Sequence, residues 1–189
     1  MSGALDLILT VDAASAAVGT TTLDDNTFAA LVTSANQSVI DYLNNDPRSQ
    51  QWTELLNGNG DTVLALNHAP ITGLTSITID QVYAVDITQV IVDRWSLIWN
   101  YGCFRYGRKN IQVVYTAGYA ASSPQMSAIQ TGVLMTVKAL IGAMDVDMNA
   151  TGESYAGILS QSFWPTGPGA IPPAARGLLE PYVNHFVVQ

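Results

Sequence analysis

The sequence is poor in charged residues, and basic residues are the scarcest. Seven Lys and Arg stand against 15 Asp and Glu among 189 residues, which gives a net charge of −8. Charged residues make up 12% of the chain, roughly half of the ~25% found in an average soluble domain. A protein that grips nucleic acid through its phosphates needs clustered Lys and Arg, so this scarcity argues against that mode. It favours a surface largely covered by neighbouring subunits, with a monomeric extracellular domain unusually poor in charge and rich in Ser, Thr and Asn as the alternative.

Cysteine occurs once, and catalytic motifs are missing. Cys103 alone excludes an intrachain disulfide and is expected to be a small buried residue. His68 and His185 stand far apart, belong to no metal-ligand spacing and are expected to be surface or structural histidines. The sequence contains no P-loop, Rossmann glycine motif or nucleophile elbow. We therefore expect no catalytic, cofactor or metal site and no enzymatic activity.

The N-terminal stretch lacks the features of a leader peptide or a membrane anchor. No positive residue precedes its apolar run, which is interrupted by Asp6 and is too short for a membrane span. The sequence therefore predicts a product without membrane contact that stays in the cytoplasm where it is made.

Helical signals open the chain. Thr10 is expected to cap a short helix over Val11 to Val18 that ends at Gly19. A second helix is expected to begin at Asp24 or Asp25, and the turn-forming residues Asn44 to Pro47 end it. Its apolar stripe consists of Phe28, Leu31, Val32, Ala35, Val39, Tyr42 and Leu43. These helices are predicted to pair as a helical hairpin.

The middle of the chain, from 49 to about 117, has the period of strands. Gln51 to Leu56 and Thr62 to Leu66 flank a turn rich in Asn and Gly, and we expect them to form a hairpin. Further strands are expected around Ile77 to Ile79, Gln89 to Val92, and Leu97 to Trp99.

Next, the sequence predicts a strand that leads directly into a long helix. Apolar residues alternate from Asn110 to Ala117, which is typical of a strand with one buried face. Gly118 is expected to hold a positive φ and turn the chain, so that Gly118→Val would cost roughly 1–3 kcal/mol. Ser123 followed by Pro124 predicts an N-cap and the first residue of a helix that extends to about Met144.

The C-terminal part is expected to be irregular and then helical. Asn149 to Pro173 is rich in Pro and Gly, which favours irregular structure. A last helix is expected over roughly Pro173 to His185, with a kink or break at Glu180 because Pro181 lies inside it.

Four of the seven basic residues fall in the short stretch from Arg94 to Lys109, together with five aromatic residues. Such interleaving can bind single-stranded nucleic acid, but a hairpin with a packed aromatic face and cations at its rim is favoured. The aromatic residues are Trp95, Trp99, Tyr101, Phe104 and Tyr106. The candidate subunit or partner contacts are Arg94, Trp95, Trp99, Arg105, Arg108 and Lys109.

Val113 to Tyr119, with Pro124 after it, resembles the V-x-Y-x-A-G-Y … P junction of the tailed-phage head-tail connector (adaptor) protein family. The run from Leu64 to Asp80 is similar to its L-x-L-x-x-x-P-I-x-x-I-x-S-V-x-V-D stretch. Val39 to Leu43 resembles its Y-L/I turn, and Gly152 to Tyr155 resembles the G-E-x-Y before its last helix.

The resemblance implies a structural virion protein. It would form a homo-oligomeric ring, a dodecamer in that family, between the portal and the head-closure or tail proteins of the neck, after assembly in the host cytoplasm. DNA would pass through the ring without sequence-specific binding, and an acidic channel would keep it from sticking. The apolar C-terminus is expected to dock on the portal, through Tyr182, Val183, Phe186, Val187 and Val188, or alternatively to pack back onto the chain's own sheet.

Two alternatives stay open. One is another virion part, such as a different neck or tail-terminator protein. The other is a carbohydrate-binding module, in which Trp52, Trp95, Trp99 and Trp164 would stack on sugars.

Together these patterns predict one α+β domain over 1–189, a small helical bundle with an inserted antiparallel β region. Its expected parts are N-terminal helices at 1–48, a β region at 49–119, a long helix at 122–148, an irregular segment at 149–172, and a C-terminal helix and tail at 173–189.

Overall fold

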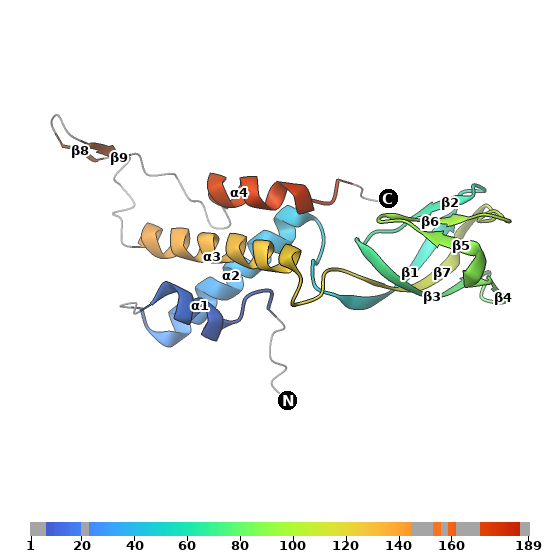
Figure 1. Ribbon diagram of the computed structural model, residues 1–189, viewed down its shortest axis with the longest axis horizontal. Coiled ribbons are helices and arrows are strands. Elements are labelled where there is room, and N and C mark those ends of the chain that lie inside the picture. The colour runs from blue at the N-terminus through green and yellow to red at the C-terminus, as the bar shows by residue number, and fades with distance from the viewer. Residues whose placement is uncertain (1–6, 20–22, 145–152, 156–158, 162–170, 186–189) are drawn as a thin grey trace. The chain divides into compact units, whose positions relative to one another are not determined.

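The α+β class is confirmed by a computed structural model that describes residues 7–19, 23–144, 153–155, 159–161 and 171–185 (Figure 1). The chain divides into two compact units. The helical unit comprises Met1–Tyr42 and Ser127–Tyr182, and the β unit comprises Leu43–Met126 and Val183–Gln189. The β unit is thus inserted between helices, as expected, while the assignment of both units to one domain stays a prediction.

The helices begin and end close to the predicted residues. They are α1 (Val11–Val18), α2 (Asp25–Leu43), α3 (Pro124–Met144) and α4 (Pro173–Leu179), followed by the 3₁₀ turn η2 (Glu180–Tyr182). The Thr10 side chain caps α1 by accepting from the nitrogen of Ala13, and Gly19 ends the helix with φ +87°. Ser123 Oγ accepts from the nitrogen of Met126 at 3.1 Å and so caps α3. The change from α4 to η2 at Glu180 confirms the predicted break.

The core of the helical unit is apolar, with amides that fix the segment before α1. Buried residues include Phe28, Val32 and Val39 of α2, Ile129, Val133 and Val137 of α3, and Ala175 and Leu179 of α4. Asn36 Oδ1 accepts from the nitrogen of Leu9 at 2.9 Å, and its amide nitrogen donates back to the Leu9 carbonyl at 3.1 Å. α3 and α4 pack closely, because a Cβ on Gly132 would lie 2.8 Å from Leu179 Cδ2.

α3 is long and apolar enough to cross a membrane by length and composition alone. Core helices of soluble proteins pass the same test, and α3 places Ile129, Val133 and Val137 in the interior of its unit. One side of α3 therefore packs inside the helical unit, and 33% of the apolar window is buried.

A short strand pair lies in the segment that was predicted to be irregular. β8 (Glu153–Tyr155) pairs antiparallel with β9 (Leu159–Gln161). Most of 149–170 lies outside the described residues.

Two antiparallel sheets form the β unit. The first has the order β1 (Gln50–Gly58), β7 (Gly107–Ala117), β3 (Ile71–Ile79) and β4 (Tyr83–Ala84). The second has the order β2 (Val63–Ala65), β6 (Ser96–Trp99) and β5 (Val90–Val92), with the 3₁₀ turn η1 (Ile87–Gln89) before β5. Side chains of both sheets share one core, whose largest fully buried members are Tyr115, Phe104, Leu66, Ile77, Leu97 and Ile111.

The predicted hairpin between Gln51–Leu56 and Thr62–Leu66 is wrong. β1 pairs with β7 and β2 pairs with β6, so the two segments belong to different sheets. The turn between them is tied to the loop after β6: the nitrogen of Gly60 donates to the Phe104 carbonyl at 2.7 Å. A turn rich in Asn and Gly fits both a hairpin and a crossing between sheets, and the long-range pairing with β7 decides between them.

Candidate partner-binding surfaces

β7 spans the β unit and defines its two ends. At Ala117 it pairs with Gln50 and Ile71, beside the segments through which the chain enters and leaves the unit. We term this the basal end. At Gly107 it pairs with Gly58, and this is the distal end.

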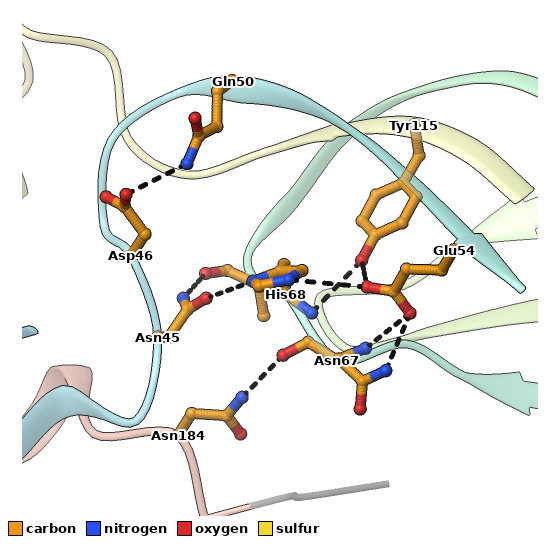
Figure 2. A network of polar contacts seen from close by, with 9 residues as sticks. Asn45, Asp46, Gln50, Glu54, Asn67, His68, Tyr115 and Asn184 are labelled. Atoms are coloured by element: carbon orange, nitrogen blue, oxygen red, sulfur yellow. Dashed lines mark hydrogen bonds and ion pairs between the residues drawn. The ribbon is translucent and has the colours of Figure 1, made fainter. Parts of the chain in front are cut away.

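A polar network at the basal end is centred on His68 (Figure 2). The imidazole stacks on Trp52 with ring centroids 3.4 Å apart, and its Nδ1 lies 3.1 Å from Asn45 Oδ1. Because an amide oxygen can only accept, Nδ1 carries the proton of the neutral ring. Nε2 lies 3.8 Å from Glu54 Oε1. His68 therefore has a structural role.

Glu54 and Tyr115 complete the network (Figure 2). The Tyr115 hydroxyl donates to Glu54 Oε1 and accepts from the backbone nitrogen of His68 at 3.2 Å. Glu54 Oε2 accepts from the backbone and side-chain nitrogens of Asn67 at 3.3 and 2.9 Å. Both carboxylate oxygens thus have donors, which a largely buried carboxylate needs.

Burial and hydrogen bonds shift the pKa values around this network. Burial lowers the pKa of His68, against the opposing effect of the Glu54 and Asp46 carboxylates. Burial raises the pKa of Tyr115, and the hydrogen bond to Glu54 raises it further. Burial alone would raise the pKa of Asp46, but hydrogen bonds from Arg48 outweigh it and hold that pKa below its usual range. At neutral pH the network therefore contains uncharged His68 and Tyr115.

The C-terminal segment is anchored in the same network. Asn184 is 1% exposed. Its backbone nitrogen donates to the Leu43 carbonyl at 2.8 Å, and its side-chain nitrogen donates to the Asn67 carbonyl at 3.0 Å. These bonds hold the last described residues against the basal end of the β unit.

The predicted portal contacts fall on both sides of this anchor. Tyr182 and Val183 precede it and are partly buried. Phe186, Val187 and Val188 lie outside the described residues.

Arg94 and Trp95 also lie at the basal end. The Arg94 side chain is exposed and donates from Nη2 to the Tyr119 hydroxyl at 3.1 Å, while its guanidinium carbon lies 5.3 Å from the centre of the Trp95 ring. The backbone carbonyl of Arg94 accepts from the nitrogen of Ile71, the first residue of β3.

Arg105, Arg108 and Lys109 lie at the distal end, so the predicted aromatic-basic hairpin is wrong. β6 and β7 belong to different sheets, and the chain crosses from the basal to the distal end along β6. Arg94 is close to the other three cations in sequence, but β6 separates it from them in space.

A bulge in β7 exposes two of the distal cations. Leu56 pairs with Ile111 and Gly58 pairs with Gly107, so three residues of β7 stand opposite one residue of β1. Arg108 and Lys109 belong to this bulge and are exposed. Bulges commonly redirect side chains in this way.

Two asparagines hold the bulge against the end of β1. Asn57 Oδ1 accepts from the nitrogen of Lys109 at 2.7 Å. Asn110 Oδ1 accepts from the nitrogen of Gly58 at 2.9 Å, and its amide nitrogen donates to the Arg105 carbonyl at 3.0 Å. Neither asparagine can be recognised from the sequence, because the signal lies in the pairing of β1 with β7 and not in a local motif.

The aromatic residues of this stretch divide into core and surface. Phe104 is fully buried and Trp99 is 8% exposed, so Trp99, a predicted contact, has little surface to offer a partner. Tyr101 and Tyr106 are 84% and 88% exposed. Cys103 is also exposed, which corrects the prediction of a buried residue; the loop turns Phe104 inward in its place.

The three tryptophans that the structure describes do not form open stacking platforms. Trp52 is covered by His68, Trp99 is in the core, and Trp95 faces the Arg94 guanidinium. Trp164 lies outside the described residues.

In the part of the chain that the structure describes, no group of three or more His, Cys, Asp or Glu side chains is placed to hold a metal ion. The expected lack of catalysis stays a prediction.

Three solved structures share this fold. They are chains from "Neck of empty GTA particle computed with C6 symmetry" (TM-score 0.61, 14% identity), "Virion of native gene transfer agent (GTA) particle" (0.58, 15%) and "Neck of native GTA particle computed with C12 symmetry" (0.56, 15%). The alignments cover 96%, 96% and 95% of this chain and 92%, 92% and 93% of those chains.

Comparison with curated proteins gave no match. A family model described as "Head completion protein" matches residues 7–184, which is nearly the whole chain and includes both units. This chain therefore belongs to the head completion protein family.

Proposed function

We propose that the protein is a structural component of the virion neck, where it forms a ring between the portal and the head-closure or tail proteins and extends the DNA channel. The observation that carries this proposal is the family match over residues 7–184. The shared fold with chains from neck and virion particles of gene transfer agents adds support. Membership of this family also removes the carbohydrate-binding alternative.

Composition and symmetry support a ring of many copies. Two of the similar chains come from necks computed with C6 and C12 symmetry, and a dodecamer of this chain fits either. A chain with 12% charged residues is well suited to burying much of its surface against copies of itself. The net charge of −8 suits a channel that DNA must slide through.

The apolar C-terminus is the proposed portal-docking segment. Asn184 anchors the chain at the basal end of the β unit and contributes to the fold. A truncation that tests docking therefore begins at Phe186. A cut at Val183 would also remove Asn184 and its bonds to Leu43 and Asn67.

Deletion of the gene from a producing genome tests the proposal. We expect DNA-filled heads and separate tails that fail to join, and joining should return when the wild-type protein is added to the lysate. Normal joining without the protein would refute the proposal. Tails of abnormal length would instead favour the tail-terminator alternative.

A further inference from the structure

The distal end of the β unit carries an exposed aromatic and basic surface. We define it by Tyr101, Arg105, Tyr106, Arg108 and Lys109 and name it the distal platform. All five side chains are exposed, and the three cations are almost half of the seven in the chain. Two tyrosines more than four-fifths exposed are unusual on a surface with no partner, since aromatic residues with Arg are typical of interface centres.

The platform is built by the fold and is not a loose loop. The loops 57–61 and 100–106 are tied by bonds from the nitrogen of Gly60 to the Phe104 carbonyl, 2.7 Å, and from the nitrogen of Phe104 to the Asp61 carbonyl, 2.8 Å. A Cβ on Gly58 would overlap the Arg105 carbonyl, so the two loops are in direct contact. Side chains on such a support lose less freedom on binding than those of a flexible loop.

Backbone strain is held at the same place. Lys109 has φ +50°, a conformation uncommon outside Gly, and its nitrogen donates to Asn57 Oδ1. Such strain persists where the surrounding structure fixes it, and it gathers at functional sites. Beside it, Asn57, Tyr106 and Arg108 are among the residues that line an open hollow of about 400 Å³.

Charge is divided unequally between the two units of the chain. The helical unit has nine acidic and two basic residues, whereas the β unit has six acidic and five basic residues. Among the described residues of the helical unit, the exposed carboxylates are Asp12, Asp24, Asp25, Asp41 and Glu180. One chain therefore offers both a basic surface and a complementary acidic one.

We propose that the distal platform is one half of the contact between copies of this chain, and that its occupant is the acidic helical unit of a second copy. The proposal rests on the ring function above. Two different surfaces that join head to tail form a heterologous interface, which closes into a ring when the rotation allows. Opposite charges would set the register, and the two tyrosines would supply most of the buried apolar area.

Single-stranded nucleic acid is the competing occupant. Tyrosines and cations suit base stacking and phosphate contact. However, Asp61 and Asp80 lie next to the platform, since the Asp80 nitrogen donates to the Asn110 carbonyl. Three cations beside these carboxylates, on a chain of net charge −8, favour an acidic protein surface over a phosphate backbone.

Cross-linking tests the contact directly, because the chain has two lysines, Lys109 and Lys138. Heads from the gene-deleted producer are incubated with an equal mixture of isotope-labelled and unlabelled protein and treated with a carbodiimide, which joins amines to carboxylates. We expect mixed-isotope links from Lys109 to a carboxylate of the helical unit. Lys109→Arg should remove these links while rings still form, and Lys138→Arg should keep them.

Other results overturn the inference. Links from Lys109 to a different protein, or only to carboxylates of the β unit, would assign the platform to another partner and leave the neck function intact. Failure of the protein to enter the heads at all would refute the neck function itself.

A charge-reversal variant gives an independent measurement. Like charges placed opposite one another cost several kcal/mol, so Arg105→Glu, Arg108→Glu and Lys109→Glu together should lower incorporation into heads about tenfold or more. The control is Arg176→Glu, an exposed cation of α4, which should incorporate normally. Unchanged incorporation of the triple variant, or oligothymidylate binding that only this variant loses, would contradict the proposed occupant.

Discussion

Gly118 is a position where a single added methyl group should both strain the backbone and collide with a neighbouring segment. It follows β7 with φ +109°, which confirms the positive φ that the sequence predicts. A Cβ built there lies within 3 Å of the backbone carbonyl of Arg48 and 2.8 Å from the nitrogen of Ser49. Backbone atoms cannot rotate away as a side chain can, so Gly118→Ala forces the two segments apart.

The expected loss of unfolding free energy in Gly118→Ala has two contributions. A positive φ for a residue with a Cβ costs roughly 1–3 kcal/mol. Separating the segments also disturbs the bonds from the nitrogen of Gly118 to the Pro70 carbonyl, 2.9 Å, and from the nitrogen of Ser49 to the Tyr119 carbonyl, 3.2 Å. Each bond contributes roughly 0.5–1.5 kcal/mol. We expect Gly118→Ala to lower the free energy of unfolding by about 2–6 kcal/mol, beyond what the φ alone implies.

Urea unfolding followed by tryptophan fluorescence measures this loss, because Trp52, Trp95 and Trp99 all lie in the β unit. The control is Gly142→Ala on α3, where a Cβ meets nothing within 4 Å. Removing a helical glycine there should leave stability unchanged or raise it by up to about 1 kcal/mol. A Gly118→Ala protein within about 0.5 kcal/mol of the wild type would refute the reasoning, since that is the range of neutral surface changes.

Three further outcomes are expected. Tyr115→Phe removes a donor from the Glu54 carboxylate and should lower the free energy of unfolding in urea by about 1–3 kcal/mol. Burial lowers the pKa of His68 below 6.5, so the unfolded chain takes up the proton first as the pH falls. The free energy of unfolding should therefore decline from near pH 6.5 down to the folded-state pKa, and His68→Gln should flatten this slope. Deletion of 186–189 should leave urea unfolding unchanged but abolish co-sedimentation with portal rings, and retained co-sedimentation would contradict tail docking.

The helix ends could be predicted from the sequence because their signals are local. Thr10 and Ser123 cap α1 and α3 through hydrogen bonds to nitrogens three residues away. Gly19 and Pro181 act through their own backbone conformations, which no distant contact has to supply. The interactions that set each helix boundary therefore lie within a few residues of it.

Strand pairing could not be predicted in the same way. The segment Gln51–Leu56 is compatible with any neighbour that presents an apolar alternation, and the nearest candidate in sequence was Thr62–Leu66. β7 is the partner in the structure because it is longer and offers a matched apolar face from Ile111 to Tyr115. The partner residues of β1 and β7 lie more than 50 positions apart along that face, so the local periodicity of either segment cannot identify its partner.

The positions of the four clustered cations can be predicted in part from the sequence. The sequence predicts a strand over Leu97 to Trp99, and residues that flank one strand lie at its opposite ends, so this strand is enough to separate Arg94 from Arg105. The exposure of Arg108 and Lys109 could not, because it depends on the bulge opposite β1. The bulge in turn needs Asn57 and Asn110 to satisfy the backbone groups that the interrupted ladder leaves unpaired. A surface of this kind is specified by two strands together, which explains why neither strand shows it alone.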